Sequence, residues 1–187
     1  DPLYSTMISK LCNFNDRCEF IIKVIKNEFT INPEQQMILL AHNKSLLQYL
    51  YDSINHHKIN TVGFYVGGMK ESQLKESESK KIILATYSMA SEGLDIKTLT
   101  TLFLASPKTD IIQAVGRILR TKHTDPLVID IVDTHDIFQR QFQKRKQYYK
   151  KQNYKVIKTS HNKYDCNEWE IIESKKKSKC HITSKLL

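Results

Sequence analysis

Three polar side chains near the middle of the chain have types and a spacing that suit phosphate chemistry. Gln113, Arg117 and Arg120 are four and three residues apart, so their side chains can share one face of a helix. Guanidinium groups pair with phosphate oxygens through two parallel hydrogen bonds, and their charge does not titrate away near neutral pH. Such a face suits a triphosphate. Spacing alone slightly favours a simpler alternative, a solvated helix face whose arginines pair with carboxylates.

The residues around this group predict the elements that would position it. Apolar runs at 82–85 and 101–105 are predicted strands, and they end at Thr86 and Ser106. Apolar residues then recur at helical spacing from Ile111 to Leu119, which predicts an amphipathic helix. Ligands of open α/β sheets bind at the carboxyl ends of the strands, so a site is expected at this rim of polar loops.

Two segments carry a resemblance to a known family. Residues 92–95, Glu-Gly-Leu-Asp, and 113–120, Gln-Ala-Val-Gly-Arg-Ile-Leu-Arg, resemble motifs V and VI of superfamily 2 helicases in order and in separation. The resemblance implies that Arg117 and Arg120 are arginine fingers that reach the β- and γ-phosphates of ATP. An arginine of this kind stabilises charge in phosphoryl transfer.

The same resemblance implies further contacts. Gly93 and Asp95 would approach the nucleotide, with Asp95 near the ribose, and Gln113 would belong to the ATP site. Thr86 would contact a backbone phosphate of nucleic acid. The expected strand 37–41 and the turn after it, which begins with His42 and Asn43, resemble motif IV. These two side chains could meet nucleic acid, although an ordinary strand-to-helix turn with a capping residue is the simpler reading of each.

Adjacent glycines follow the next expected strand, at 61–66. Gly67 and Gly68 allow a ligand to approach the backbone closely, or simply let the chain turn. In helicases similar to this chain the corresponding loop lies near the nucleic-acid strand. The resemblance therefore adds both glycines to the expected nucleic-acid track.

Two departures from the RNA-dependent DEAD-box pattern bear on the kind of nucleic acid. Gln113 stands where those proteins have histidine, and one more residue separates Thr86 from Gly93. Both features are similar to DNA-repair and DNA-translocating helicases and to those of large cytoplasmic DNA viruses, which weakly favours DNA over RNA. The alternatives are an RNA- or transcript-acting helicase and a non-catalytic nucleic-acid-binding domain. The intact set of Gln113, Arg117 and Arg120 argues against the non-catalytic domain.

The alternation of expected strands and helices predicts an α/β parallel sheet flanked by helices, which the resemblance sharpens to the second RecA-like domain of a helicase. We expect a helical linker at 1–33, the RecA-like domain at 34–154 and a basic extension at 155–187. The linker helix should begin with Asn15 as its N-cap. A basic helix is expected at 134–151, and a hairpin is expected from strands near 154–159 and 168–172.

The formal net charge of +9 is concentrated near the carboxyl end of the chain. Residues 1–134 hold 15 basic and 15 acidic side chains, whereas residues 135–187 hold 14 basic and 5 acidic ones. This distribution suggests a phosphate-rich partner, and a solvated tail is the alternative for the last dozen residues. Asp130 and Asp133 are expected to pair with nearby arginines or to cap a helix.

Several absences in the sequence restrict the function. It contains no GxxxxGK[ST] phosphate loop and no Asp-Glu pair after an apolar strand. We therefore expect half an ATPase site, with ATP and Mg²⁺ held mainly by a preceding amino-terminal RecA-like domain. With no secretory or membrane-spanning apolar segment, an intracellular location is expected: cytoplasm or nucleus, or a cytoplasmic replication site or virion if the protein is viral.

The four cysteines do not predict a metal site. They are scattered along a chain without a secretion signal, so reduced thiols are expected. His161, Cys166, Cys180 and His181 could in principle gather around zinc, but their spacing matches no usual zinc-binding pattern.

Overall fold

The computed structural model describes residues 3–92, 94–118, 126–173 and 183–186, with the backbone alone at 117–118 and 183–186. Its helices are α1 (Tyr4–Cys12), α2 (Asn15–Ile31), α3 (Lys44–His56), α4 (Glu71–Glu78), α5 (Tyr87–Glu92), α6 (Ile112–Ile118) and α7 (Asp136–Lys151). Its strands are β1 (Met37–Ala41), β2 (Val62–Tyr65), β3 (Ile82–Thr86), β4 (Thr101–Leu104), β5 (Leu127–Asp130), β6 (Lys155–Lys158), β7 (Glu170–Glu173) and β8 (Thr183–Leu186).

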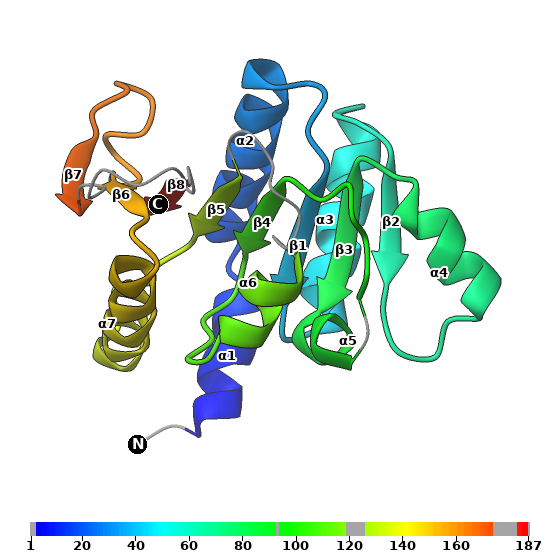
Figure 1. The fold of residues 1–187 in the computed structure, drawn as a ribbon, viewed down its shortest axis with the longest axis horizontal. Coiled ribbons are helices and arrows are strands. Elements are labelled where there is room, and N and C mark those ends of the chain that lie inside the picture. The colour runs from blue at the N-terminus through cyan, green and yellow to red at the C-terminus, as the bar shows by residue number, and fades with distance from the viewer. Residues whose placement is uncertain (1–2, 93, 119–125, 174–182, 187) are drawn as a thin grey trace.

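These strands form one sheet in the order β2-β3-β1-β4-β5-β8-β6-β7 (Figure 1). The first five are parallel, and Leu39 of β1 lies between Leu84 of β3 and Phe103 of β4. β1 and β3 are buried along their whole length, as expected for central parallel strands that are covered on both faces and therefore consist of continuous apolar runs. The expected α/β parallel sheet flanked by helices is confirmed.

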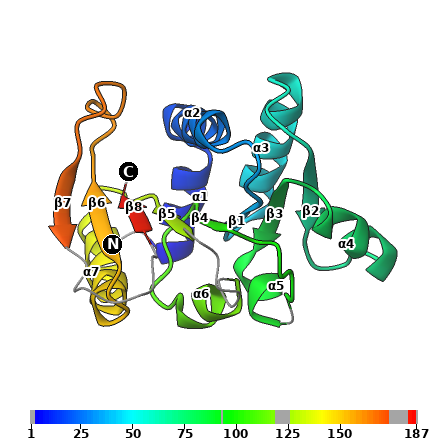
Figure 2. The same ribbon diagram turned by 45° about the horizontal axis from the view of Figure 1, so that its top comes forward.

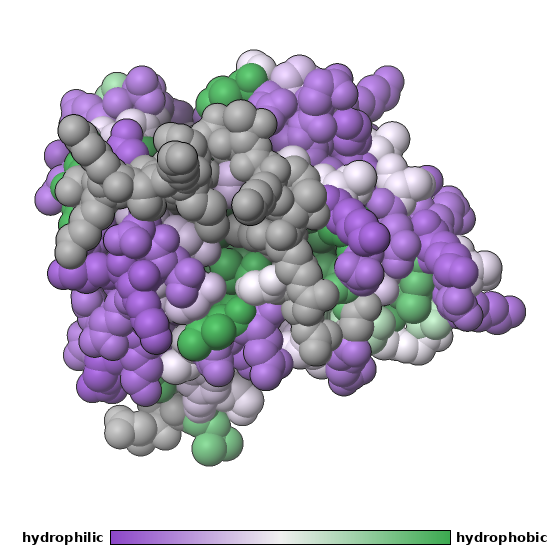
Figure 3. All heavy atoms as spheres, in the orientation of Figure 1, coloured by the Kyte–Doolittle hydropathy of each residue, from purple (hydrophilic) through white to green (hydrophobic). Residues whose placement is uncertain are grey.

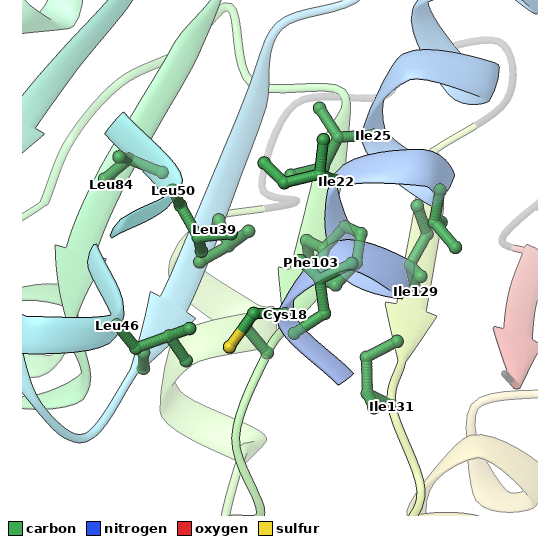
Figure 4. Packing of buried hydrophobic residues seen from close by; sticks show 14 of the residues in the cluster. Cys18, Ile22, Ile25, Leu39, Leu46, Leu50, Leu84, Phe103, Ile129 and Ile131 are labelled. Carbon is green, nitrogen blue, oxygen red and sulfur yellow. The ribbon is translucent and has the colours of Figure 1, made fainter. Parts of the chain in front are cut away.

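Helices cover both faces of the sheet, with α2 and α3 on one side and α5, α6 and α7 on the other (Figure 2). Alternate residues of each strand serve the two layers. Leu39 belongs to the α2 and α3 layer, whereas its neighbours Ile38 and Leu40 belong to the layer of α5 and α6. Figure 4 shows Cys18, Ile22 and Ile25 of α2 packed near sheet residues of the first layer.

Two helices differ from the sequence-based expectation, α2 in its first residue and α6 in its buried face. Asn15 is the first residue of α2 rather than its N-cap; Phe14 takes the cap position, and no side chain caps the helix end. Ile112 was expected on the apolar face of α6, but it is 55% exposed. The buried face is formed instead by Ile111, Ala114 and Val115, because residues three and four apart lie on the same side of a helix and their immediate neighbours do not.

The region beyond α7 joins the main sheet. β6 and β7 form the expected antiparallel hairpin, and β8 pairs in parallel with both β5 and β6. The sequence pattern does not predict β8, because its residues, Thr-Ser-Lys-Leu, lack both an apolar run and a clear alternation. Its backbone groups are satisfied by neighbouring strands on both sides, which fixes this segment between two parts of the chain that are distant in sequence.

Candidate functional site

The predicted site residues follow strands that end at the same edge of the sheet. β1, β3 and β4 are parallel, and the residues after them are His42, Tyr87 and Ala105, with Thr86 closing β3. The structure therefore brings the segments around residues 42, 86 and 106 to one rim, although they are widely separated in sequence. This rim is the edge on which a ligand of an open parallel sheet is expected to bind.

His42 is held at the rim by neighbours from two other strand ends. Its backbone N–H donates to Ser106 Oγ at 3.0 Å, and its Nδ1 lies 3.3 Å from the same oxygen. The ring packs edge-on against Tyr87 at 4.9 Å, and the Tyr87 hydroxyl donates to the Ser106 carbonyl. Burial and the nearby Lys108 lower the pKa of His42, so its imidazole is neutral at neutral pH. Any contact that His42 makes with a ligand at this rim would therefore be a hydrogen bond or a stacking contact rather than an ion pair.

Asn43 caps α3, because its side-chain oxygen accepts a hydrogen bond from the Leu46 N–H at 3.1 Å. This is the capping arrangement that the simpler reading of the turn expects. The next residue, Lys44, donates from Nζ to the Gly67 carbonyl at 3.1 Å. The turn after β1 is thereby connected to the glycine pair after β2.

Gly67 and Gly68 are exposed at the end of β2. Gly68 has a φ of +90°, a backbone conformation that other residues rarely adopt. Glycine is thus required by the turn itself at position 68, whether or not a ligand approaches it.

Thr86 is largely buried at the end of β3, and its hydroxyl lies 3.1 Å from Ser88 Oγ at the start of α5.

The helices that adjoin the segments resembling motifs V and VI are neighbours: α5, which ends at Glu92, packs against α6, which contains residues 113–118 (Figure 2). Asp95 follows α5 and is exposed. Gln113 is exposed on α6, whose opposite face is buried through Ala114 and Val115. Among the described residues outside α6, none lies within 4 Å of a Cβ placed at Gly116 on the same helix. The described residues therefore leave the surface of α6 beside Gly116 uncovered.

Of the predicted site residues, one is described by its backbone alone and two lie outside the described ranges. Arg117 lies in α6, where only the backbone is described, and Gly93 and Arg120 lie outside the described residues. Residues four apart on α6 share a face, so the backbone of Arg117 is on the same side of the helix as exposed Gln113.

Two buried arginines form ion pairs near the rim, and each pairs with one of the aspartates that were expected to pair with arginines. Arg17 of α2 binds Asp133 through Nε at 2.6 Å and Nη2 at 2.9 Å, and Nη2 also donates to the Ala105 carbonyl at 2.8 Å. Arg145 of α7 binds Asp130 through Nε at 2.8 Å and Nη2 at 2.9 Å. The structural roles predicted for the two aspartates are confirmed.

Arg145 also reaches the loop that leads into α6. Its Nη1 donates to the Lys108 carbonyl at 2.5 Å, and the Tyr149 hydroxyl donates to Asp130 at 2.9 Å. Burial opposes the charge of Arg145, but the Asp130 carboxylate outweighs this effect and raises the pKa of the guanidinium above its usual value. Sequence analysis missed this contact because its acceptor is a backbone carbonyl, which no residue type reveals.

A cavity of about 690 Å³ lies between α2, the start of α7 and the segment after β6. Arg17, Phe20, His135 and His161 are among its lining residues, and none of the predicted site residues is. Within the described ranges no group of three His, Cys, Asp or Glu side chains could hold a metal ion. No helix in the described part of the chain is long and apolar enough to cross a bilayer.

Comparison with known proteins places these features in a family context. Residues 16–122 match the model of the helicase conserved C-terminal domain. The chain is 42% identical over 162 residues to "Putative ATP-dependent RNA helicase L396" of Acanthamoeba polyphaga mimivirus, an alignment that covers 84% of this chain and 31% of the relative. It is 25% identical over 173 residues to QP509L of African swine fever virus (isolate Pig/Kenya/KEN-50/1950), which carries the same description, covering 82% of this chain and 34% of the relative.

The fold is also found in a solved structure. The crystal structure of T4 UvsW superimposes with a TM-score of 0.66 at 19% sequence identity, over 100% of this chain and 37% of that protein. At this identity the likeness concerns the fold alone. The chain spans about a third of the length of the relatives named above.

Proposed function

The chain belongs to the helicase conserved C-terminal domain family, and we therefore propose that it is the second RecA-like motor domain of an ATP-dependent superfamily 2 helicase or translocase that acts on nucleic acid. The observation that carries the proposal is the family match over residues 16–122. That range contains every residue of the motif V and VI segments and of the rim. The activity of the whole protein is part of the proposal, because the chain spans only about a third of its relatives.

In this proposal α6 and the residues after it carry the catalytic groups. Arg117 and Arg120 act as arginine fingers on the β- and γ-phosphates of ATP, where they stabilise the charge of phosphoryl transfer. Gln113 lies four residues before Arg117 on α6, and Gly93 and Asp95 are proposed to approach the nucleotide from the segment after α5. Support comes from the exposure of Gln113 and Asp95 and from the packing of α5 against α6.

The rim supplies part of the nucleic-acid track. Thr86, His42, Asn43, Gly67 and Gly68 are proposed to meet the strand, and this assignment is supported by the parallel pairing of β1, β2 and β3, whose carboxyl ends lie at one edge of the sheet. His42 is neutral and Asn43 already caps α3. Contacts from these two residues would therefore be hydrogen bonds or stacking.

The nucleotide and its metal need a second domain. The described residues hold no metal-binding cluster, so none of them is proposed as a Mg²⁺ ligand. We place Mg²⁺ and most of the ATP contacts in a preceding amino-terminal RecA-like domain. Closure of the two domains on ATP and reopening after hydrolysis would be a hinge-type cycle that moves one domain along a strand.

DNA and RNA are both candidate substrates, each favoured by a different observation. Gln113 and the spacing between Thr86 and Gly93 favour DNA. The printed names of the viral relatives describe RNA helicases, which favours RNA. We propose DNA as the first candidate and RNA as the second.

A direct comparison tests the proposal. The full-length protein is assayed for ATP hydrolysis with no nucleic acid, with single-stranded DNA and with RNA of the same sequence. DNA is expected to stimulate turnover more strongly than RNA. Stimulation by RNA alone selects the second candidate, and an absence of hydrolysis under all three conditions rejects the ATPase proposal.

A further inference from the structure

The outer face of α7 carries a row of cations, three of which form no ion pair with a described residue. Beyond Asp136, α7 contains Arg140, Lys144, Arg145, Lys146, Lys150 and Lys151 and no acidic residue. Arg145 is buried against Asp130, and Lys146 and Lys150 each approach Glu173 Oε1 at 3.9 Å. Arg140, Lys144 and Lys151 are exposed, and no described residue forms an ion pair with them.

These three cations form one narrow stripe. At about 100° per residue, Arg140, Lys144 and Lys151 lie within about 40° of each other around the helix axis, and they span about 16 Å along it. The buried side chains of the helix lie on the opposite side, and they are Phe138, Phe142, Arg145 and Tyr149. Figure 3 shows hydrophilic residues gathered over the position of α7. The sheet thus fixes the orientation of the stripe toward solvent.

Cations on and just after another surface helix, α4, form ion pairs with carboxylates of that helix. On α4 Lys75 pairs with Glu71, and just after the helix Lys80 pairs with Glu76, in both cases at i,i+4 and 3.1 Å. Pairs of opposite charge at this spacing stabilise a helix, whereas like charges destabilise it by a similar amount. Arg140 and Lys144 are a like-charge i,i+4 pair on α7. Lys151 lies in the last turn of α7, where a cation suits the helix dipole, and Asp136 lies four residues before Arg140 but forms no ion pair with it in the described structure. No ion pair with a described residue offsets the repulsion between Arg140 and Lys144, which points to an anion outside the chain.

We propose that Arg140, Lys144 and Lys151, the α7 stripe, form a second contact surface for nucleic-acid phosphates, separate from the strand-end rim. A row of cations on a rigid helix matches a polyanion whose charges repeat along a line, and binding releases the counterions of the backbone. The choice of nucleic acid over another polyanion rests on the proposed function. Contacts of this kind are made to the backbone and carry no sequence information directly.

The test compares two triple variants of the 187-residue chain that lose the same charge. The first is R140Q/K144Q/K151Q. The second, the control, is K75Q/K80Q/K81Q, whose lysines are all paired with glutamates: Lys75 with Glu71, Lys80 with Glu76 and Lys81 with Glu34. Fluorescence anisotropy measures the Kd for labelled single-stranded DNA and RNA over a range of salt concentrations, and circular dichroism checks that each variant is folded.

The stripe variant should bind both nucleic acids at least about tenfold more weakly near 0.1 M salt, and its plot of log affinity against log salt should be shallower by roughly 2 to 3. The control should retain nearly the affinity and slope of the unchanged chain. Equal weakening of both variants, or an unchanged stripe variant, overturns the proposal. So does binding of the unchanged chain to vesicles of anionic lipid in preference to nucleic acid.

The result also separates this proposal from the proposed function. An unaffected stripe variant beside a nucleic-acid-stimulated full-length ATPase rejects the stripe alone. If the stripe variant binds nucleic acid more weakly than the control but the full-length protein hydrolyses no ATP, the motor proposal alone is rejected. If the unchanged chain binds no nucleic acid at all, the α7 stripe is rejected together with the rim contacts.

Discussion

The arginines of this chain divide into two kinds. Arg17 and Arg145 are buried and form two-nitrogen pairs with Asp133 and Asp130. A buried arginine paired in this way is part of the framework, because removing either partner leaves an uncompensated charge. Asp130 and Asp133 are thereby engaged by Arg145 and Arg17.

In the full-length protein, Arg117→Ala or Arg120→Ala should lower kcat for ATP hydrolysis by about a thousandfold or more. Nucleic-acid binding should be nearly unchanged, because the lost interaction forms chiefly with charge that develops in the transition state. Arg120→Lys should also be poor, since an ammonium group cannot reproduce the planar fork of a guanidinium. Steady-state kinetics and the thermal midpoint are measured on the same samples.

The two roles of these arginines leave opposite patterns. Fingers that face an open cleft predict stable, inactive variants. A structural ion pair predicts a lower thermal midpoint with activity retained per folded molecule. Stable variants with unchanged kcat would remove the assignment of Arg117 and Arg120 as fingers.

At the scale of elements, α7 holds the loop from which α6 starts. The Arg145 guanidinium uses two nitrogens for Asp130 and its third for the Lys108 carbonyl. The Asp110 side chain accepts a hydrogen bond at 3.0 Å from the backbone N–H of Ile112, the first residue of α6. The position of α6, and with it the direction of any group on its outer face, therefore depends on a helix that follows it in sequence.

Arg145→Lys should keep the charge beside Asp130 but lose the bond to Lys108. In the full-length protein we expect kcat to fall roughly tenfold to a hundredfold, because small displacements of catalytic groups cost this much, while the KM for ATP changes less. Arg145→Met should additionally destabilise the fold, by about 3–5 kcal/mol, since it leaves Asp130 buried without its partner. Kinetics and urea unfolding give the two readouts.

Lys150→Met serves as the matched control, because Lys150 is on the same helix but largely exposed, at 71% of its side chain. It should leave both readouts nearly unchanged. A loss of stability in Arg145→Lys with kcat retained per folded molecule would show that Arg145 holds the core together without positioning α6.

At the scale of the whole molecule, the chain is expected to provide one side of a two-domain site. The purified 187-residue chain should hydrolyse ATP negligibly, with or without nucleic acid, because its sequence contains no phosphate loop. The rate is measured by phosphate release and compared with that of the full-length protein at the same concentration. Robust turnover that nucleic acid stimulates and that Arg117→Ala abolishes would contradict the two-domain account.

Residue patterns were enough to identify the central strands and to suggest a candidate chemistry. Met37–Ala41 and Ile82–Thr86 could be identified because strands buried on both faces are continuous apolar runs, and the Gln113 helix because apolar residues repeat every three to four positions. The roles of the motif residues were inferred from residue type and spacing together with the resemblance to superfamily 2 helicases, and they stay predictions. The first residue of α2 and the buried face of α6 were not predicted correctly, as Asn15 and Ile112 show.

How these segments meet depends on the order of the strands in the folded sheet. Ser106 holds His42 from 64 residues away, Arg145 reaches the Lys108 carbonyl across 37 residues, and β8 enters the sheet between β5 and β6. None of these contacts has a local signal, because their partners are backbone groups or side chains brought together by strand order. A short strand such as β8 is stabilised by hydrogen bonds from both neighbours, and those neighbours exist only once the sheet has formed.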